Sequence, residues 1–465
     1  MPDQKQELLR TLPAITELLK NETIAGWLRQ HPQPLVTECL RRALAELREE
    51  ILTGSRSGGV PAADVLARAE KKLSCAIRPK VREAINATGI ILHTGLGRAV
   101  ISCGVVDSML GELKGYCTLA VDRETGERTE RDELVEYILT ELTGAEAATV
   151  VNNNAAATML ALAALVAQKE VIVSRGQLIE IGGSFRLPDV MAQSGARLVE
   201  VGATNRTHPR DYEKAVTENT SAILRAHPSN YRVVGFTSEV SLRELAELCR
   251  RRNLTLIDDL GAGALVSLEQ FGLPHEPTVR ESIEAGADVV LFSGDKLIGA
   301  GQSGIIVGKK LLIDKLRKHP LMRAVRVDKT CLMVLERTLQ LFRDPARLRS
   351  EHPTYRMMAT PMADLKSRAK KLARLIAAAE PRIRTEIRES EAFLGSGSLP
   401  TEAIPSFAVA VSLPDLSAGD LSQRLRLDDA CVFSRIEADR VRLDVRTLTD
   451  EQVPLVAAAM GRIAA

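Results

Sequence analysis

The sequence has few aromatic residues and no excess of charge. Phe, Trp and Tyr make up 3% of the 465 residues, with a single Trp. So few rings offer little for stacking, which argues against recognition of splayed, unpaired nucleic-acid bases. The 62 Lys and Arg residues nearly balance the 60 Asp and Glu residues, for a formal net charge of +2. Overall charge therefore gives no indication of a nucleic-acid partner.

Paired cysteines and long apolar runs are also missing. The seven cysteines are scattered without a Cys-x-x-Cys pair, which argues against both a disulfide framework and a zinc site. The longest apolar run, residues 155–167, is shorter than the roughly 18 residues that span a bilayer. Residues 1–20 show no cleavable leader pattern. We expect a cytoplasmic protein with no metal centre and no contact with a membrane.

The order of expected elements indicates three domains. Apolar residues recur at helical spacing through residues 1–53, which predicts helices there, and a further helix is expected over 61–74. From about residue 85, strands alternate with helices, the pattern of an open, mainly parallel α/β sheet. The expected strands are 148–151, 171–174, 197–201, 221–225, 255–258, 288–293 and 305–307. We predict a helical domain over 1–75, a large α/β domain over 76–345 and a smaller α+β domain over 346–465.

Lys296 is the first candidate for chemistry. It lies between the buried-looking strand 288–293 and a glycine-rich turn with Gly299, Gly301 and Gly304. An ammonium group placed there loses much of its hydration, and such lysines are often reactive amines with a lowered pKa. A lysine that forms a Schiff base with pyridoxal phosphate fits this position. A surface lysine in a turn is the alternative from this window alone.

Asparagine and aspartate residues at two other strand ends are the next candidates. Asn153, Asn154 and Ala155 open the apolar helix after strand 148–151, where free backbone amides favour a phosphate. Taken alone, this motif is better explained by simple helix capping. Asp258 and Asp259 end strand 255–258. Because successive strand residues face opposite sides, only one of them can contact a cofactor's pyridine nitrogen. We favour Asp259, with Asp258 as the alternative.

Three arginines are candidates for binding an anion. Arg98 lies in a glycine-rich loop, and Arg323 and Arg326 are three residues apart, so on a helix they would share one face. Guanidinium groups bind phosphate-like anions through paired hydrogen bonds. A solvated helix face with ion pairs is the alternative.

The order of asparagines, Asp259 and Lys296 resembles the layout of the aspartate-aminotransferase (fold type I) superfamily of pyridoxal-phosphate enzymes. Six segments look like those of one family within it, the bacterial L-seryl-tRNA(Sec) selenium transferases or selenocysteine synthases. They are residues 85–99, 150–155, 174–190, 202–208, 293–310 and 395–400. The chain departs from the family's usual pattern at Gln177, in place of Glu, at Gly301, in place of Pro, and at Thr129, in place of Gly.

The resemblance implies an activity. Pyridoxal 5'-phosphate would serve in β-elimination of the serine hydroxyl from seryl-tRNA(Sec), giving aminoacrylyl-tRNA, and selenophosphate would then supply selenium to give selenocysteinyl-tRNA(Sec). Lys296 would carry the cofactor and take the Cα proton, Asp295 would act as an acid or positioning group, and Gln177 would lie near the cofactor ring. Arg98, Arg323 and Arg326 would bind selenophosphate. The family also implies a decamer built from dimers, with tRNA bound by the N-terminal domain.

Local charge supports an RNA partner only in part. Residues 56–84 carry a net charge of +4 and residues 366–388 one of +6, whereas residues 1–52 carry −1; solvated helix faces have the same composition. Two other functions therefore stay open. One is a pyridoxal-phosphate lyase of a small amino acid or amino sugar without an RNA partner. The other is a non-catalytic tRNA-binding protein on the same fold.

Overall fold

The computed structural model describes residues 2–182, 185–395 and 397–464. The chain divides into two compact units, Met1–Glu83 and Ala84–Ala465. The boundary that we predicted after residue 75 lies inside helix α5 (Ala62–Ile77), and the division falls just after that helix. None of the described helices is both long enough and apolar enough to cross a bilayer.

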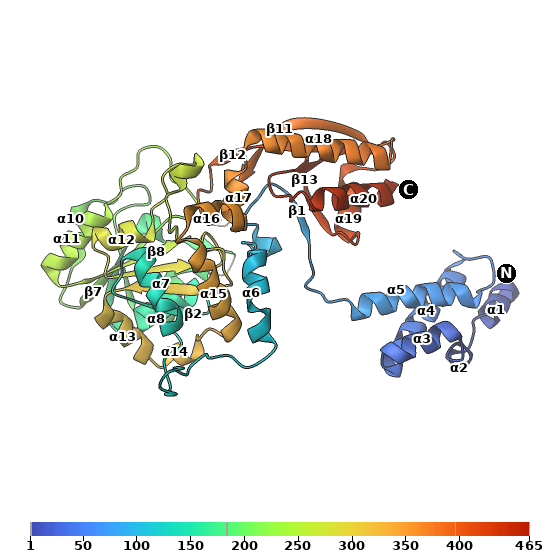
Figure 1. Ribbon diagram of the computed structural model, residues 1–465, viewed down its shortest axis with the longest axis horizontal. Helices are drawn as coiled ribbons and strands as arrows, with labels where there is room; N and C mark the ends of the chain where they lie inside the picture. Colours follow the sequence, from blue (N-terminus) through green and yellow to red (C-terminus); the bar gives the residue numbers. More distant parts are fainter. Residues whose placement is uncertain (1, 183–184, 396, 465) are drawn as a thin grey trace. The chain divides into compact units, whose positions relative to one another are not determined.

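Unit 1 is helical, as its apolar spacing predicts (Figure 1). Its helices are α1 (Pro2–Arg10), α2 (Ile15–Leu18), α3 (Glu22–Gln30), α4 (Gln33–Thr53) and α5. The long helices α4 and α5 pack along each other around fully buried Leu40, Leu47, Ile51 and Val65. Helix α4 ends where Gly54 adopts the left-handed conformation (φ 82°), which residues with a side chain rarely adopt. Unit 1 therefore has a hydrophobic core of its own.

Unit 2 is built on a seven-stranded, mainly parallel sheet, and all seven predicted strands are present. The strand order is β2-β10-β9-β8-β7-β3-β6, and only β10 is antiparallel, to both β2 and β9. The strands are β2 (Ala147–Val151), β3 (Glu170–Ser174), β6 (Arg197–Val201), β7 (Thr220–Ala226), β8 (Thr255–Gly261), β9 (Val289–Ser293) and β10 (Gly304–Gly308).

Helices cover both faces of this sheet, because its strands are apolar on both sides. In β9, Val289 and Leu291 enter one core and Val290 and Phe292 enter the other. The helices are α6 (Cys103–Leu113), α7 (Glu133–Thr143), α8 (Asn154–Leu165), α9 (Leu187–Gln193), α10 (Pro209–Ala215), α11 (Leu242–Arg252), α12 (Val279–Ala285), α13 (Lys310–Lys318), α14 (Leu321–Ala324), α15 (Lys329–Leu341), α16 (Pro345–Glu351) and α17 (Pro353–Ala359). A short hairpin, β4 (Glu180–Ile181) and β5 (Phe185–Arg186), follows β3.

A second sheet in unit 2 has its own core with helices α18 (Met362–Ala379), α19 (Ala418–Leu427) and α20 (Gln452–Ala464). Its strand order is β1-β13-β14-β12-β11, and only the pairing of β1 with β13 is parallel. The strands are β1 (Ile85–Ala87), β11 (Arg384–Phe393), β12 (Ala403–Ser412), β13 (Val432–Glu437) and β14 (Arg440–Asp444). Residues 85–87 therefore belong to the smaller sheet, although they precede the large one in sequence.

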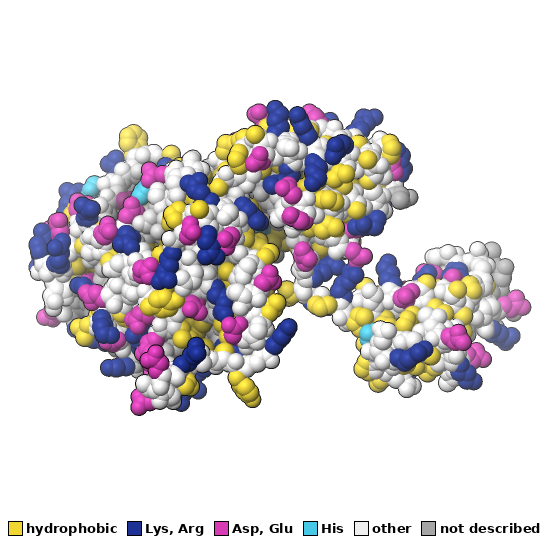
Figure 2. All heavy atoms as spheres, viewed as in Figure 1, with side chains coloured by type: hydrophobic (Ala, Val, Ile, Leu, Met, Phe, Trp, Pro, Cys, Tyr) yellow, Lys and Arg dark blue, Asp and Glu magenta, His cyan; other side chains and the backbone are white. Residues whose placement is uncertain are grey.

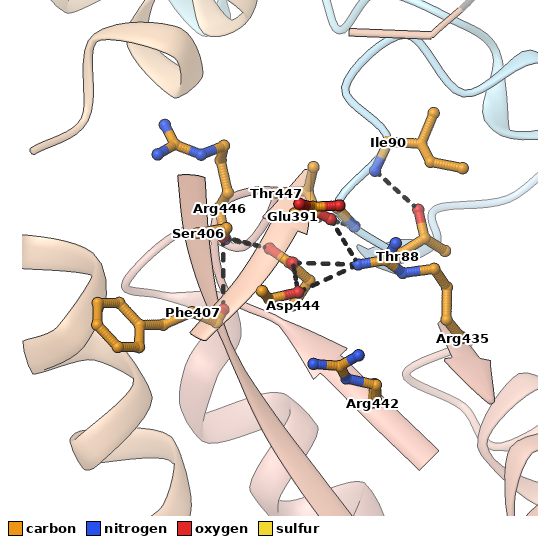
Figure 3. Close-up of polar contacts among 12 residues, drawn as sticks. Thr88, Ile90, Glu391, Ser406, Phe407, Arg435, Arg442, Asp444, Arg446 and Thr447 are labelled. Atoms are coloured by element: carbon orange, nitrogen blue, oxygen red, sulfur yellow. Dashed lines mark hydrogen bonds and ion pairs between the residues drawn. The ribbon is translucent and has the colours of Figure 1, made fainter. Parts of the chain in front are cut away.

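A buried carboxylate, that of Asp444 on β14, connects this strand to its neighbours in the second sheet (Figure 3). Asp444 accepts hydrogen bonds from the hydroxyls of Ser390 (2.9 Å) and Ser406 (2.7 Å) and contacts the guanidinium of Arg435 (3.3 Å). Gly89 turns tightly beside it with φ 75°, and a Cβ there would lie 2.7 Å from Asp444 Cγ. The Gly89 amide donates to Thr447 Oγ1 (3.1 Å), which fixes the chain as it leaves β1 and runs toward the loop of Arg98.

Candidate active site

Lys296 lies in the turn between β9 and β10 and is 6% exposed. Burial lowers the pKa of Lys296, and the positive charge of Arg98 lowers that pKa further. The carboxylates of Asp259, Asp295 and Glu276 act in the opposite direction. The position that we predicted from the glycine-rich turn is thus a buried amine with an increased tendency to be uncharged and nucleophilic.

The two aspartates at the end of β8 face opposite sides of the sheet. Asp259 accepts hydrogen bonds from Asn154 Nδ2 (2.8 Å), Thr158 Oγ1 (3.0 Å) and the Gly261 amide (3.1 Å). Burial raises the pKa of Asp259, and these three donors oppose that rise. Asp258 instead pairs with Arg225 (2.8 Å) and accepts from Ser282 (2.7 Å). Only Asp259 lines the cavity that contains Lys296.

The asparagines at the start of α8 use their side chains within the protein. Asn153 is the N-cap and accepts a hydrogen bond from the Ala156 amide (2.9 Å), whereas Asn154 donates to Asp259. Any anion at this helix end would therefore be bound by backbone amides rather than by these side chains. Gly304 of β10 packs so closely on the turn that a Cβ there would clash with the Asn153 carbonyl.

Arg98 and Asp295 form an ion pair beside Lys296. Arg98 Nη1 lies 2.6 Å from Asp295 Oδ2, and Arg98 has a left-handed backbone with φ 64°. An arginine seldom adopts this conformation, so the loop is held there by its surroundings. The amide of Arg98 donates to the His93 carbonyl (2.9 Å), which closes the turn.

These groups share one cavity of about 300 Å³, which we call the Lys296 cavity. Its lining includes Arg98, Asn153, Asn154, Ala155, Asp259 and Lys296. It also includes residues that the sequence analysis did not identify, among them Ile179, Phe185, His227, Ser229 and Gln302.

His227 is the most informative of the missed residues. It follows β7 directly, and its Nδ1 is buried without a hydrogen-bond partner among the described residues. Burial, followed by the charge of Arg225, lowers the pKa of His227 to about 4, so the ring is neutral at pH 7. A histidine directly after a predicted strand was the available signal.

Gln177 does not line the Lys296 cavity. Its Oε1 accepts from the Ala226 amide (3.3 Å), and the residue lines a neighbouring cavity of about 290 Å³, which we call the adjoining cavity. His227 lines both cavities. Glu276, which the sequence analysis also missed, is 4% exposed in the adjoining cavity, and burial raises its pKa to about 7.

Arg323 and Arg326 lie in neither of these cavities. They line a third one of about 720 Å³ with Arg128, Arg131 and Arg317, which we call the arginine cavity. The expectation that Arg323 and Arg326 share a helix face was wrong, because α14 ends at Ala324 and Arg326 forms a bridge to Val151 of β2. Desolvation and the charges of Arg131, Arg323 and Arg128 lower the pKa of Arg326. Within one chain, Arg98 is thus separate from the other two predicted anion-binding arginines.

Comparison with known proteins identifies the family. A family model described as L-seryl-tRNA selenium transferase matches residues 84–449, nearly all of unit 2. The chain belongs to this family. A second model, described as selenocysteine synthase N terminal, matches residues 9–48 of unit 1.

Relatives of the family are similar over almost the whole chain. A protein named L-seryl-tRNA(Sec) selenium transferase from Caldanaerobacter subterraneus subsp. tengcongensis is 46% identical, covering 97% of each chain. Proteins of the same name from Geobacter metallireducens and Alkaliphilus oremlandii are 44% and 40% identical, covering 98% and 99% of this chain and 99% of each relative.

The fold is also found outside the family. The solved structure of D-glucosaminate-6-phosphate ammonia-lyase has a TM-score of 0.58 and 22% identity, covering 83% of this chain and 96% of that one. The predicted fold type I architecture, a mainly parallel α/β sheet with a smaller α+β part, is confirmed.

The Lys296 cavity of this family member fits a cofactor that has an aldehyde, a basic ring nitrogen and a phosphate. Lys296 offers the amine, Asp259 a fixed carboxylate and the start of α8 its backbone amides. His227 Nδ1 lacks a partner among the described residues and can bind a further polar atom.

Proposed function

We propose that this protein converts seryl-tRNA(Sec) to selenocysteinyl-tRNA(Sec) in the cytoplasm with pyridoxal 5'-phosphate and selenophosphate. One observation carries the proposal: a buried lysine, a buried aspartate and a helix N-terminus meet in one cavity. The chain that forms this cavity is similar along its length to proteins named L-seryl-tRNA(Sec) selenium transferase.

Three parts of the Lys296 cavity would hold the cofactor. When bound, pyridoxal phosphate supplies an aldehyde for amines and a ring that accepts electrons from the substrate's Cα. Lys296 Nζ would attach to the aldehyde, Asp259 would bind the pyridine nitrogen, and the amides at the start of α8 would bind the phosphate. The hydrogen bonds from Asn154, Thr158 and Gly261 orient the carboxylate of Asp259.

The chain's own groups also account for the proton and anion steps. Once the substrate amine has displaced it, Lys296 is a free amine, and its lowered pKa suits it to take the proton from the serine Cα. The serine hydroxyl would then leave as water, and selenium from selenophosphate would add at Cβ with release of phosphate. Arg98, fixed by Asp295, offers a guanidinium to an anion in this cavity.

We further propose that the active site is shared between copies of the chain. Asp295 neutralises much of the charge of Arg98, so the Lys296 cavity has little positive charge left for a multiply charged selenophosphate. The arginine cavity has a surplus, with Arg128, Arg131, Arg323 and Arg326. In a homo-oligomer such as the expected decamer, Arg323 and Arg326 of one copy would face the Lys296 cavity of another.

Unit 1 is our candidate for tRNA binding. Support comes from its separate core, from its match to the selenocysteine synthase N-terminal model and from the basic composition of residues 56–84. Deletion of residues 1–83 should weaken tRNA(Sec) binding while the cofactor still loads, as measured by filter binding and by absorbance. Unchanged affinity would assign RNA binding to unit 2.

A single-turnover assay tests the function as a whole. Purified protein, seryl-tRNA(Sec) and selenophosphate should yield selenocysteinyl-tRNA(Sec), whereas seryl-tRNA(Ser) should not react. Lys296→Ala should abolish the product and the absorbance band of the lysine-bound cofactor. Cofactor bound to Lys296 without any product from either tRNA would instead favour a lyase of a small amino acid or amino sugar.

A further inference from the structure

The adjoining cavity has no role in the proposed chemistry, although it lies next to the site. It is lined by the ends of β3 and β7, by the turn 204–207 after β6 and by residues 399–402. Its volume of about 290 Å³ is near the lower end of the roughly 300–1,000 Å³ of ligand pockets. It can therefore hold one ligand of nucleoside size, and His227 forms a wall that it shares with the Lys296 cavity.

The charges around the adjoining cavity do not suit a phosphate. Arg232 is paired with Glu402 (2.8 Å), and the carboxyl groups of Glu239 and Glu276 outnumber the one other arginine in the lining, Arg206. The remaining lining combines apolar side chains, such as Val233 and Leu399, with hydroxyl and amide groups of Thr204, Asn205, Thr237 and Ser238. Such groups hydrogen-bond to ribose hydroxyls and to base edges.

An exposed aromatic ring lies beside two residues that line this cavity. Phe236 is 84% exposed, and the guanidinium of Arg206, which lines the cavity, lies 6.0 Å from its ring centroid. The Phe236 carbonyl accepts from Asn205 Nδ2 (2.7 Å) and Arg206 Nε (3.3 Å). The backbone at the ring is thus fixed while the ring stays open to solvent, the arrangement of a base-stacking platform.

The covalent structure of the substrate places a nucleoside close to the Lys296 cavity. The serine of seryl-tRNA is esterified to the ribose of the 3'-terminal adenosine, and its amine must reach Lys296. That adenosine must therefore lie within one aminoacyl ester of the Lys296 cavity. On the side of His227, the structure offers a cavity of nucleoside size with an exposed ring beside its lining residue Arg206.

We propose that the adjoining cavity binds the 3'-terminal nucleoside of the tRNA, with Phe236 stacking on an unpaired base of the 3' end. This rests on the proposed function, because it names where the RNA end of that substrate lies. It also differs from the expectation from composition that unpaired bases are not stacked on aromatic side chains. Few rings are needed, since one at the right place holds one base.

Binding of uncharged RNA to the cofactor-loaded full-length protein tests the proposal. Wild type should bind tRNA(Sec) more tightly than the same RNA lacking its 3'-terminal nucleoside, and Thr237→Trp, which fills the cavity, should abolish this difference. Phe236→Ala should weaken binding of the complete RNA by about five- to a hundredfold, the range for the loss of one stacked base. Phe236→Tyr should retain tight binding, and Val234→Ala, on the same exposed loop, is the matched control.

The outcomes separate this proposal from the function on which it rests. Equal affinity of wild type for the two RNAs, or wild-type binding by both Phe236→Ala and Thr237→Trp, would overturn the nucleoside site while leaving the transferase activity intact. A wild-type protein that makes no selenocysteinyl-tRNA(Sec) and binds no tRNA would overturn both. In the expected case, all variants load the cofactor normally, because none of the changed residues lines the Lys296 cavity.

Discussion

At the scale of single residues, the adjacent Asp258 and Asp259 have different partners although both are buried. The carboxylate of Asp258 is neutralised by Arg225 and belongs to the sheet's internal packing. That of Asp259 is surrounded by neutral donors and faces the Lys296 cavity. Removal of either charge should therefore affect a different property.

We expect Asp259→Asn to lower the single-turnover rate by about 10²–10³-fold, as when a preorganised electrostatic group is removed from an active site. Its thermal stability should change little, because Asn keeps the shape. Asp258→Asn should do the reverse and destabilise the fold by about 3 kcal/mol, because Arg225 loses its buried charge partner. Single-turnover assays and denaturant unfolding of both variants measure these two effects. Equal single-turnover rates of the two variants would contradict the assignment of Asp259.

Glu276 links stability to pH. Burial raises its pKa from 4.5 to about 7, so between these values the folded protein binds a proton that the unfolded chain has released. Its contribution to stability is thus present below about pH 4.5 and is lost as pH rises toward 7, by at most about 3 kcal/mol. Glu276→Gln has no such carboxyl group and does not lose stability in this way. The melting temperature of the variant minus that of wild type should therefore increase from pH 5 to pH 8.

The exposed Glu247→Gln is the control for the loss of one negative charge. A Glu276→Gln difference that stays constant from pH 5 to pH 8 would mean that the Glu276 carboxyl is solvated in the folded protein.

At the scale of elements, the site depends on the close contact of β10 with the start of α8. Gly304 has no side chain, and for this reason β10 can lie against the Asn153 carbonyl. The same turn supplies Asn154, which orients Asp259. One of the glycines that drew attention to Lys296 in the sequence therefore also shapes the opposite wall of its cavity.

We expect Gly304→Ala to destabilise unit 2 by about 1–3 kcal/mol through overpacking and to weaken cofactor binding by displacing the turn of Asn153. Gly301→Ala is the matched control, since a Cβ there lies 3.9 Å from Cys331, an ordinary contact. Absorbance titration with pyridoxal phosphate compares the two variants, and equal cofactor affinities would contradict a role of this contact in shaping the site.

At the scale of the whole molecule, Lys and Arg on the surface are mostly accompanied by Asp and Glu, whereas one cavity collects several arginines. On the face shown in Figure 2, Lys and Arg side chains of unit 2 are interspersed with Asp and Glu. The arginine cavity is the exception, with a cluster of guanidinium groups separate from Lys296. The proposed active site shared between copies would explain why one chain keeps these parts apart.

Mixing two inactive variants tests this arrangement. Lys296→Ala and Arg326→Ala should each be inactive alone. After joint refolding or coexpression, about a quarter of the wild-type activity should return, because a site then takes Lys296 from one variant and Arg326 from the other. Activity of the mixture no higher than that of either variant would place both residues in sites formed by a single chain.

The sequence by itself determined the elements of the large sheet, the place of Lys296 in a tight turn and the choice of Asp259. Strand and helix periodicity is local, and alternation along a strand already assigns neighbouring aspartates to opposite faces. The helical N-terminal region was also clear, because its apolar spacing repeats over several turns.

Only the tertiary structure decided which of these residues meet. Asn154 bonds to Asp259 across 105 positions, Arg98 pairs with Asp295 across 197, and β1 joins a sheet formed by the other end of the chain. Such pairs depend on strand order and register, which local periodicity does not encode. For the same reason, the sequence could not separate Arg98 from Arg323 and Arg326, nor bring His227 and the residues beside Phe236 into the lining of one cavity.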